Sequence, residues 1–356
     1  MTVSRCAGAC VVGLGAALLI AATVPRAQSG SDLEGLLTDT MGFSDADLRA
    51  LDAGSAVIRS LDTSMREELA HVGVVYVDAA PEQFLERFRD IEQFEKGPGI
   101  PQIGRFDSPP RSTDLASLTL PIGDFAALSR CRPGDCDLKL SAAAMSRFRN
   151  EVEWSSAHAA RQADDLARSV ILDLVLAYQA GGNAALGSYD DDDTPLSVAK
   201  QVEGLLASDD PLPVAVPALL AYLDTYPRER PAGAEDFFYW TVVDFGLKPT
   251  IRVNHVTIYP LRSSPVSGVA YAIAIKQIYA SHYFHTTLEL RFVIEHDRAE
   301  GPGSALISIT RSRNDGMTGF KGFFLRSTIR RRSRDGVRGY LEHVRRQIVR
   351  PVLPTF

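Results

Sequence analysis

The stretch Thr286-Thr-Leu-Glu-Leu-Arg-Phe-Val-Ile-Glu295 alternates between polar and apolar side chains, and it decides the expected fold. Successive side chains of a β-strand point to opposite faces, so the apolar residues share one face: Leu288, Leu290, Phe292 and Ile294. The opposite face carries mainly polar residues: Thr287, Glu289, Arg291 and Glu295. This alternation predicts an antiparallel sheet with one buried face.

Further strands, rich in β-branched and aromatic residues, are expected on both sides: Phe237–Phe245, Ile251–Tyr259, Ala270–Tyr279 and Ala305–Arg311. A helix over 318–349 is expected to follow, with an apolar stripe of Val337, Tyr340, Leu341, Val344 and Ile348. A length of 356 residues suggests about two domains, or one with a large insertion. Apolar residues at 45% and charged residues at 23% exclude disorder, collagen and coiled coil.

The chain before these strands is mostly helical in pattern. A strand over His71–Val77 is expected to turn into a helix that begins at Pro81 and ends at Gly97-Pro98-Gly99. Within residues 141–231 the clearest helix is expected over Asp164–Ala180, and two more are expected over Leu196–Ala207 and Val216–Thr225. Segment 30–70 is polar, and its best helix candidate is Asp45–Leu61. The acidic run Asp190–Asp193 lacks the spacing of a calcium loop, so a solvated loop is expected there.

This order of elements resembles that of the START-related helix-grip superfamily. The local similarity is Val74-Val-Tyr-Val-Asp-Ala-Ala-Pro-Glu-Gln-Phe-Leu-Glu-Arg-Phe-Arg-Asp-Ile91, a strand and a small-residue–Pro turn that lead into a helix with Asp90 near its end. The resemblance covers 71–96 and 235–350, and the helical block at 141–231 departs from the family pattern. The resemblance implies an α+β fold in which a curved antiparallel sheet grips the long C-terminal helix and encloses a cavity.

Three parts of the chain are expected: a signal peptide over 1–29, an N-terminal helical extension over 30–70 and, from the resemblance, a START-like domain over 71–356 with a helical insertion at about 141–231. Arg5 precedes an apolar run over 10–24, which is typical of a secretory signal. That run is shorter than the about 20 residues of a membrane span. Cleavage is expected after Ser29, with Ala27 as the alternative.

The leader predicts an exported protein, periplasmic or secreted, and an uncleaved N-terminal membrane anchor is the alternative. No later stretch predicts a membrane span. Cys131 and Cys136 lie beyond the leader and bracket Arg-Pro-Gly-Asp, a turn sequence. In an oxidising compartment they are expected to form a disulfide bond. A redox-active pair usually has two intervening residues, whereas this pair has four.

Charge is distributed unevenly. Loss of Arg5 and Arg26 with the leader changes the net charge from −6 to −8, yet residues 311–350 carry +9, which leaves −17 on the rest. The acidic majority argues against nucleic-acid binding. The basic helix has two interpretations: a solvated face that pairs with the acidic body, or a surface that meets an anionic membrane. The membrane-facing candidates are Phe320, Phe323, Phe324, Arg330 and Arg331.

A ligand site is expected on the sheet, where aliphatic and aromatic residues mix with polar tips. Its candidate residues are His255, Tyr259, Tyr271, Gln277, Tyr279 and His282. The leading hypothesis is a non-enzymatic exported protein that binds or carries a lipid or another hydrophobic molecule, with no cofactor. An ordinary core with satisfied polar groups is the simpler interpretation of the same residues.

Two other functions remain open. One is a metal-dependent hydrolase that uses His255, His282 and a carboxylate partner. The other is an envelope interaction module, in which the helical block binds a protein and the basic helix docks on the membrane. The sequence has no His-Glu-x-x-His helix, Gly-x-Ser-x-Gly elbow, phosphate-binding loop or dinucleotide fingerprint.

Overall fold

The computed structural model describes residues 33–97, 99–207, 216–244, 246–261, 268–297, 301–315 and 319–349. Within the last range, only the backbone is described for 319–326 and 349. The expected leader, its cleavage site and the anchor alternative lie outside the described residues. So do the side chains of Phe320, Phe323 and Phe324.

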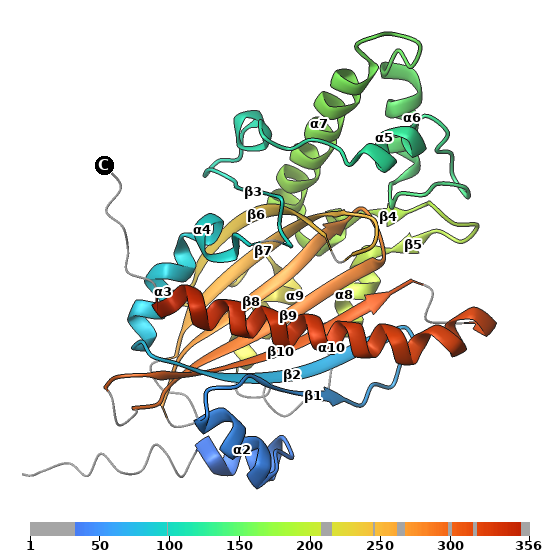
Figure 1. Ribbon diagram of the computed structural model, residues 1–356. Coiled ribbons are helices and arrows are strands. Elements are labelled where there is room, and N and C mark those ends of the chain that lie inside the picture. The colour runs from blue at the N-terminus through green and yellow to red at the C-terminus, as the bar shows by residue number, and fades with distance from the viewer. Residues whose placement is uncertain are drawn as a thin grey trace, which may run out of the picture.

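The centre of the molecule is a curved, eight-stranded antiparallel sheet (Figure 1). Its strand order is β1-β2-β10-β9-β8-β7-β6-β3. The strands are β1 Val57–Leu61, β2 Glu68–Val77, β3 Gln102–Arg105, β6 Glu235–Val243, β7 Thr250–Pro260, β8 Val269–Ala280, β9 Phe284–Glu295 and β10 Ser304–Asn314. The α+β class and the curved antiparallel sheet expected from the sequence are therefore confirmed.

Helices cover both faces of this sheet. The helices are α2 Asp45–Asp52, α3 Pro81–Arg89, α4 Ile91–Glu95, α5 Ile122–Leu128, α6 Ala142–Glu151, α7 Ala159–Gly181, α8 Val198–Leu206, α9 Pro217–Thr225 and α10 Gly319–Val349. Short elements complete the described chain: η1 Leu36–Thr40, η2 Ser112–Leu115, η3 Gly182–Leu186, and the small hairpin of β4 Ser188–Tyr189 and β5 Leu196–Ser197. Helices α3, α4 and α10 pack on one face, and α2, α7, α8 and α9 pack on the other.

Helix α10 lies across the first of these faces (Figure 1). Its apolar residues Leu341, Val344 and Ile348 are buried in the core that α3 and α4 share with the sheet. Gly73 on β2 permits the close approach, because a Cβ atom there would lie 2.5 Å from Leu341 Cδ1. We call the covered surface the α10 face of the sheet.

The expectation of only one buried sheet face is wrong. Glu289 and Arg291 alternate with apolar residues along β9 as the sequence indicates, but α3, α4 and α10 cover them. Arg291 is only 2% exposed. Alternation reports which side chains share a face, and it cannot show whether a distant helix covers the polar face.

The expected helix over Asp45–Leu61 is also wrong in its second half. Helix α2 ends at Asp52, and Gly54 follows with φ +83°, a conformation that ends helices and favours glycine. The β-branched pair Val57-Ile58 then begins β1, which pairs with β2. The segment over 30–70 therefore contributes a strand to the sheet and is not purely helical.

The helix expected after Pro81 is divided in two. Asp90 has φ −84° and ψ 67°, so α3 ends at Arg89 and α4 begins at Ile91. The Asp90 side chain accepts a hydrogen bond from the backbone N–H of Gln93 and caps α4. This break brings Glu95 to the α10 face, where it lies close to Tyr340.

Helices α5, α6 and the first half of α7 form a lobe with a small core of its own, which includes Met145 and Phe148 (Figure 1). Among the described residues, Ala159–Leu186 is long and apolar enough to cross a membrane by length and composition. From the sequence alone, no membrane span is expected after the leader. In this fold, Ile171, Val175 and Tyr178 of α7 are buried against the sheet.

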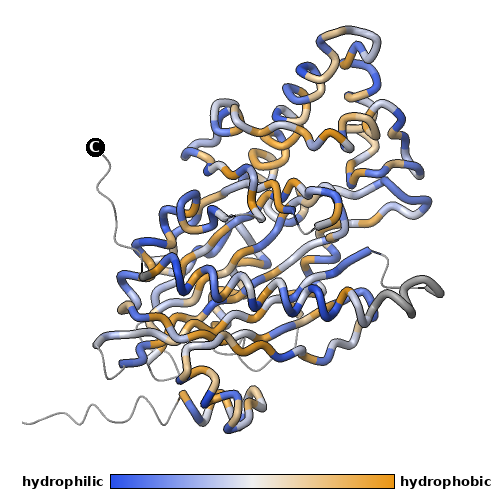
Figure 2. The backbone as a smooth tube through the Cα atoms, viewed as in Figure 1, coloured by the Kyte–Doolittle hydropathy of each residue, from blue (hydrophilic) through white to orange (hydrophobic). Residues whose placement is uncertain are grey.

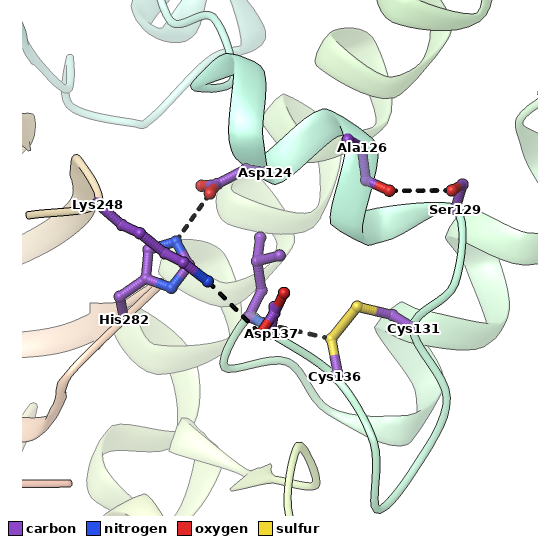
Figure 3. The surroundings of a disulfide bond; sticks show 9 residues. Asp124, Ala126, Ser129, Cys131, Cys136, Asp137, Lys248 and His282 are labelled. Atoms are coloured by element: carbon purple, nitrogen blue, oxygen red, sulfur yellow. Dashed lines mark hydrogen bonds and ion pairs between the residues drawn. A yellow bond between two sulfur atoms is a disulfide. The ribbon is translucent and has the colours of Figure 1, made fainter. Parts of the chain in front are cut away.

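Cys131 and Cys136 form the expected disulfide bond, with an S–S distance of 2.05 Å, in the loop after α5 (Figure 3). His282 lies near this loop and makes a 2.8 Å hydrogen bond with Asp124. The disulfide therefore closes a loop in the segment that holds α5 beside the β8–β9 turn.

Replacing both Cys131 and Cys136 with alanine is expected to lower the free energy of unfolding by about 2 kcal/mol. The chain-entropy model gives this value for so short a closed loop. Urea unfolding of the variant and of the oxidised wild type measures it. A reduced wild type that unfolds at the same urea concentration as the oxidised protein would contradict the prediction.

Candidate functional site

Three polar side chains from neighbouring strands lie side by side on the α10 face. Asn254 of β7 is the cross-strand partner of Gln277 of β8. The pairing of Lys276 with Leu288 places Gln277 next to Thr287 of β9. Their exposed fractions are 1%, 1% and 6%, so water does not solvate them. We call Asn254, Gln277 and Thr287 the polar row.

Each member of the polar row has a polar atom without a hydrogen-bond partner among the described residues. These atoms are Asn254 Oδ1, Gln277 Nε2 and Thr287 Oγ1. A buried polar group left without a partner costs about 1–3 kcal/mol, so such groups are rare in native proteins. Three in adjacent strand positions offer one acceptor, one donor and one hydroxyl that could do either.

A charged cluster lies beside the polar row on the same face. Arg291 donates from Nε to Glu289 Oε1 at 2.7 Å and from Nη2 to Glu289 Oε2 at 3.1 Å. Ser308 donates to the same Glu289 oxygen at 2.6 Å. Arg291 Nη1 has no hydrogen-bond partner among the described residues, so this cation keeps a free donor.

Helices α4 and α10 complete the cluster. Tyr340 of α10 donates to Glu95 Oε1 at 2.5 Å, and the same oxygen lies 3.8 Å from Arg291 Nη2. The Arg291 guanidinium is 4.8 Å from the ring centroid of Tyr340 and 5.4 Å from that of Phe88. We call Glu95, Glu289, Arg291 and Tyr340 the Arg291 cluster.

The two carboxyl groups of the cluster have different electrostatic environments. Burial raises the pKa of Glu95, although Arg291 and Tyr340 oppose the shift. Burial also acts to raise the pKa of Glu289, but Arg291, with its direct hydrogen bonds, holds that pKa below its ordinary value. Glu289 is therefore the fixed anionic partner of Arg291, and Glu95 is the carboxyl group that protonates more readily.

Arg252 connects the row with the cluster. Its Nε donates to Gln277 Oε1 at 2.8 Å, and its positive charge acts on both Glu95 and Glu289. Apolar residues next to the row on the same face are Phe237, Val256 and Ile275. Unpartnered polar atoms beside apolar walls can hold a small molecule with a polar head, because such molecules need both kinds of surface.

A second buried network lies on the opposite face and includes His255. Asp236 accepts from His255 Nε2 at 3.0 Å, so the other ring nitrogen, Nδ1, can accept from Tyr178 Oη at 3.1 Å. Burial lowers the pKa of His255 to about 4, although the hydrogen bond that it donates to Asp236 acts to raise the pKa. His255 has no exposed surface, so this network holds α7 to the sheet and leaves no room for a substrate.

Lys276, which is not among the residues predicted from the sequence, belongs to the same region. It is the cross-strand neighbour of His255 and is 1% exposed. Its Nζ donates to Asn183 Oδ1 at 2.8 Å and to the Leu223 carbonyl at 2.9 Å. Burial lowers the pKa of Lys276 to about 7. The crevice beside it, lined by Leu205, Leu206 and Leu288 among others, has no space for a water molecule, so it does not form a ligand pocket.

The structure does not bring the six predicted ligand residues together. Tyr271 and Gln277 lie on the α10 face, whereas His255, Tyr259 and Tyr279 lie on the opposite face. Cross-strand pairing explains the positions of His255 and Tyr259, because they pair with Lys276 and Ala272, respectively, and paired residues share a face. A β-bulge explains Tyr279: the pairing of β7 and β8 shifts between Val253 and Asn254, which sends Tyr279 to the side opposite Gln277. His282 lies in the β8–β9 turn, bonded to Asp124.

The hydrolase hypothesis required His255 and His282 to share a metal. They bond different carboxylates, Asp236 and Asp124, from different elements. Within the parts of the chain that the structure describes, no group of three or more His, Cys, Asp or Glu side chains is arranged to hold a metal ion.

Six residues of this site are not among those predicted from the sequence: Asn254, Thr287, Glu289, Arg291, Glu95 and Tyr340. One signal was present, because Thr287, Glu289 and Arg291 had been placed on one strand face and assigned to solvent. Comparison with known family models, curated proteins and solved structures gives no match to this chain.

Proposed function

We propose that the protein binds an apolar small molecule or lipid whose polar head meets the polar row and Arg291, between the sheet and α10. The observation that carries this proposal is the set of four buried, unpartnered polar atoms on one sheet face, from Asn254, Gln277, Thr287 and Arg291. A head with both an acceptor and a donor would satisfy them. The neighbouring Phe237, Val256 and Ile275 would contact the apolar part.

The proposal includes the helix-grip arrangement and an exported location. Contacts of α10 with β2, α3 and α4 support a sheet that closes on the terminal helix. The disulfide bond supports a protein that folds in an oxidising compartment. Native mass spectrometry of the purified protein, together with organic extraction, tests for a bound molecule. A protein that carries none, and takes up none from a panel of fatty acids, phospholipids and sterols, would refute the proposal.

The Thr287→Val variant is expected to make the protein more stable and its ligand binding weaker. Valine has nearly the same shape as threonine and removes a buried hydroxyl that lacks a partner, so the free energy of unfolding should rise by about 1 kcal/mol. Urea unfolding of the ligand-free protein and titration with a ligand found by extraction measure the two effects.

Thr286→Val is the matched control, because Thr286 is the preceding residue on the opposite face. Its buried hydroxyl donates to the Gln277 carbonyl at 2.9 Å, so the same substitution should lower the free energy of unfolding by about 1 kcal/mol. Ligand affinity should change little. Equal stability changes in the two variants would mean that Thr287 has a partner.

A further inference from the structure

Helix α10 presents a row of arginines on the side that faces away from the sheet. Arg331, Arg332, Arg338 and Arg346 are exposed, whereas Leu341, Val344 and Ile348 point into the core. At a rise of 1.5 Å per residue, positions 331 and 346 are about 22 Å apart along the helix. The described part of α10 is largely hydrophilic in Figure 2, on the outside of the molecule.

These four arginines do not pair with the acidic body. None of them forms an ion pair with a carboxylate of the described residues, although two acidic residues lie between them along the helix, the exposed Asp335 and the half-buried Glu342. A solvated face that pairs with the rest of the protein was the simpler interpretation of this helix. The geometry instead leaves four guanidinium groups directed outward from one side of an acidic chain.

Arg330 has a different position from its neighbour Arg331. It is half-buried, and its charge, with that of Arg334, helps burial to lower the pKa of His71 on β2. Arg330 therefore faces the sheet side of the helix, whereas Arg331, which was also predicted to face a membrane, is exposed.

We propose that the outer arginine row of α10 docks on the headgroups of an anionic lipid bilayer. A flat bilayer that contacts the outer arginine row touches only this side of the molecule. The acidic remainder lies behind it, where ions screen charges beyond about 8–10 Å. A flexible polyanion such as nucleic acid would also meet the acidic sides, so the charge distribution favours the planar surface. The apolar stripe of α10 is occupied by the sheet, so the helix lies on the bilayer without inserting that stripe.

Vesicle co-sedimentation tests this surface with the full mature chain. Wild-type protein should bind vesicles that contain phosphatidylglycerol and not those of phosphatidylcholine alone, and it should be released as the salt concentration rises towards about 1 M. Replacing Arg331, Arg332, Arg338 and Arg346 with glutamine should weaken binding by about a hundredfold or more, since each arginine near an anionic surface contributes a severalfold factor.

The matched control replaces four exposed arginines elsewhere with glutamine: Arg130, Arg149, Arg161 and Arg228. It changes the net charge equally, so binding should fall far less than in the α10 variant. Equal losses would show that net charge alone matters and would overturn the proposal. Wild-type binding that does not depend on anionic lipid would also overturn the proposal. So would salt-sensitive self-association through the same arginines in the absence of vesicle binding. Circular dichroism of both variants checks that they fold.

Discussion

Replacing Glu289 with glutamine is expected to lower the free energy of unfolding by about 3–5 kcal/mol, the cost of leaving a buried charge uncompensated. Glu289 accepts two hydrogen bonds from Arg291, which is 2% exposed. The remaining carboxylate near Arg291 is Glu95 at 3.8 Å, and burial favours the protonated form of that group. Glutamine keeps the volume and one acceptor, so the loss is electrostatic. Urea unfolding near neutral pH measures it.

Two further variants separate this explanation from a general packing defect. The double variant Glu289→Gln with Arg291→Met also removes the positive charge that would be left without its partner, so much of the lost free energy of unfolding should return. Glu235→Gln breaks an ion pair with Arg89 in which both side chains are about half exposed, and it should cost at most about 1 kcal/mol. If Glu289→Gln costs no more than Glu235→Gln, Arg291 is not a buried charge that depends on Glu289.

The sequence predicted the antiparallel strands well, because alternation and β-branched residues are local signals. The strand expected over 286–294 is found at Phe284–Glu295, and the strand expected over 270–279 at Val269–Ala280. The terminal helix was expected over 318–349 and spans Gly319–Val349. These elements carry their own patterns and need no knowledge of the partners that cover them.

The site could not be predicted in the same way, because it depends on contacts between distant parts of the chain. Glu95 meets Tyr340 across 245 positions, and β2, in the first part of the described chain, pairs with β10 in its last part. The β-bulge at Val253 and Asn254 has no clear local pattern, yet it decides that Gln277 and Tyr279 lie on opposite faces. Strict alternation along β8 therefore led to a mixed set of candidates.

The unpartnered atoms of the polar row also explain why stability and binding should oppose each other. A core optimised for stability would replace Thr287 and its neighbours with apolar residues, as it does at Ile275 and Val256 two positions away. Groups that cost free energy in the free protein and are satisfied in a complex are common at functional sites. This is the physical reason to test binding and unfolding on the same variants.

The protein is expected to lose about 5 kcal/mol of stability between about pH 7.5 and pH 4.5 through two buried histidines. Burial lowers the pKa of both His71 and His255 from 6.5 to about 4. At mildly acidic pH, the two histidines therefore bind protons in the unfolded chain but stay neutral in the folded protein. The stability from each neutral ring is fully present above pH 6.5 and is lost as the pH falls towards 4, by about 2.5 kcal/mol each at pH 4.5.

Substitution isolates this effect from the carboxyl groups, whose shifts act in both directions. The lowered pKa of Asp236 adds an acid-side loss below about pH 4, whereas the raised pKa of Glu95 opposes it. His71→Gln and His255→Gln should each flatten the dependence of the unfolding free energy on pH between 4.5 and 6.5, by up to about 1.4 kcal/mol per pH unit. His158→Gln, at an exposed position, gives the reference slope. If His71→Gln and His255→Gln both keep that reference slope, the two imidazole rings are already protonated in the folded protein. In that case charged rings make the hydrogen bonds of His71 with Ser60 and Ser333 and of His255 with Asp236.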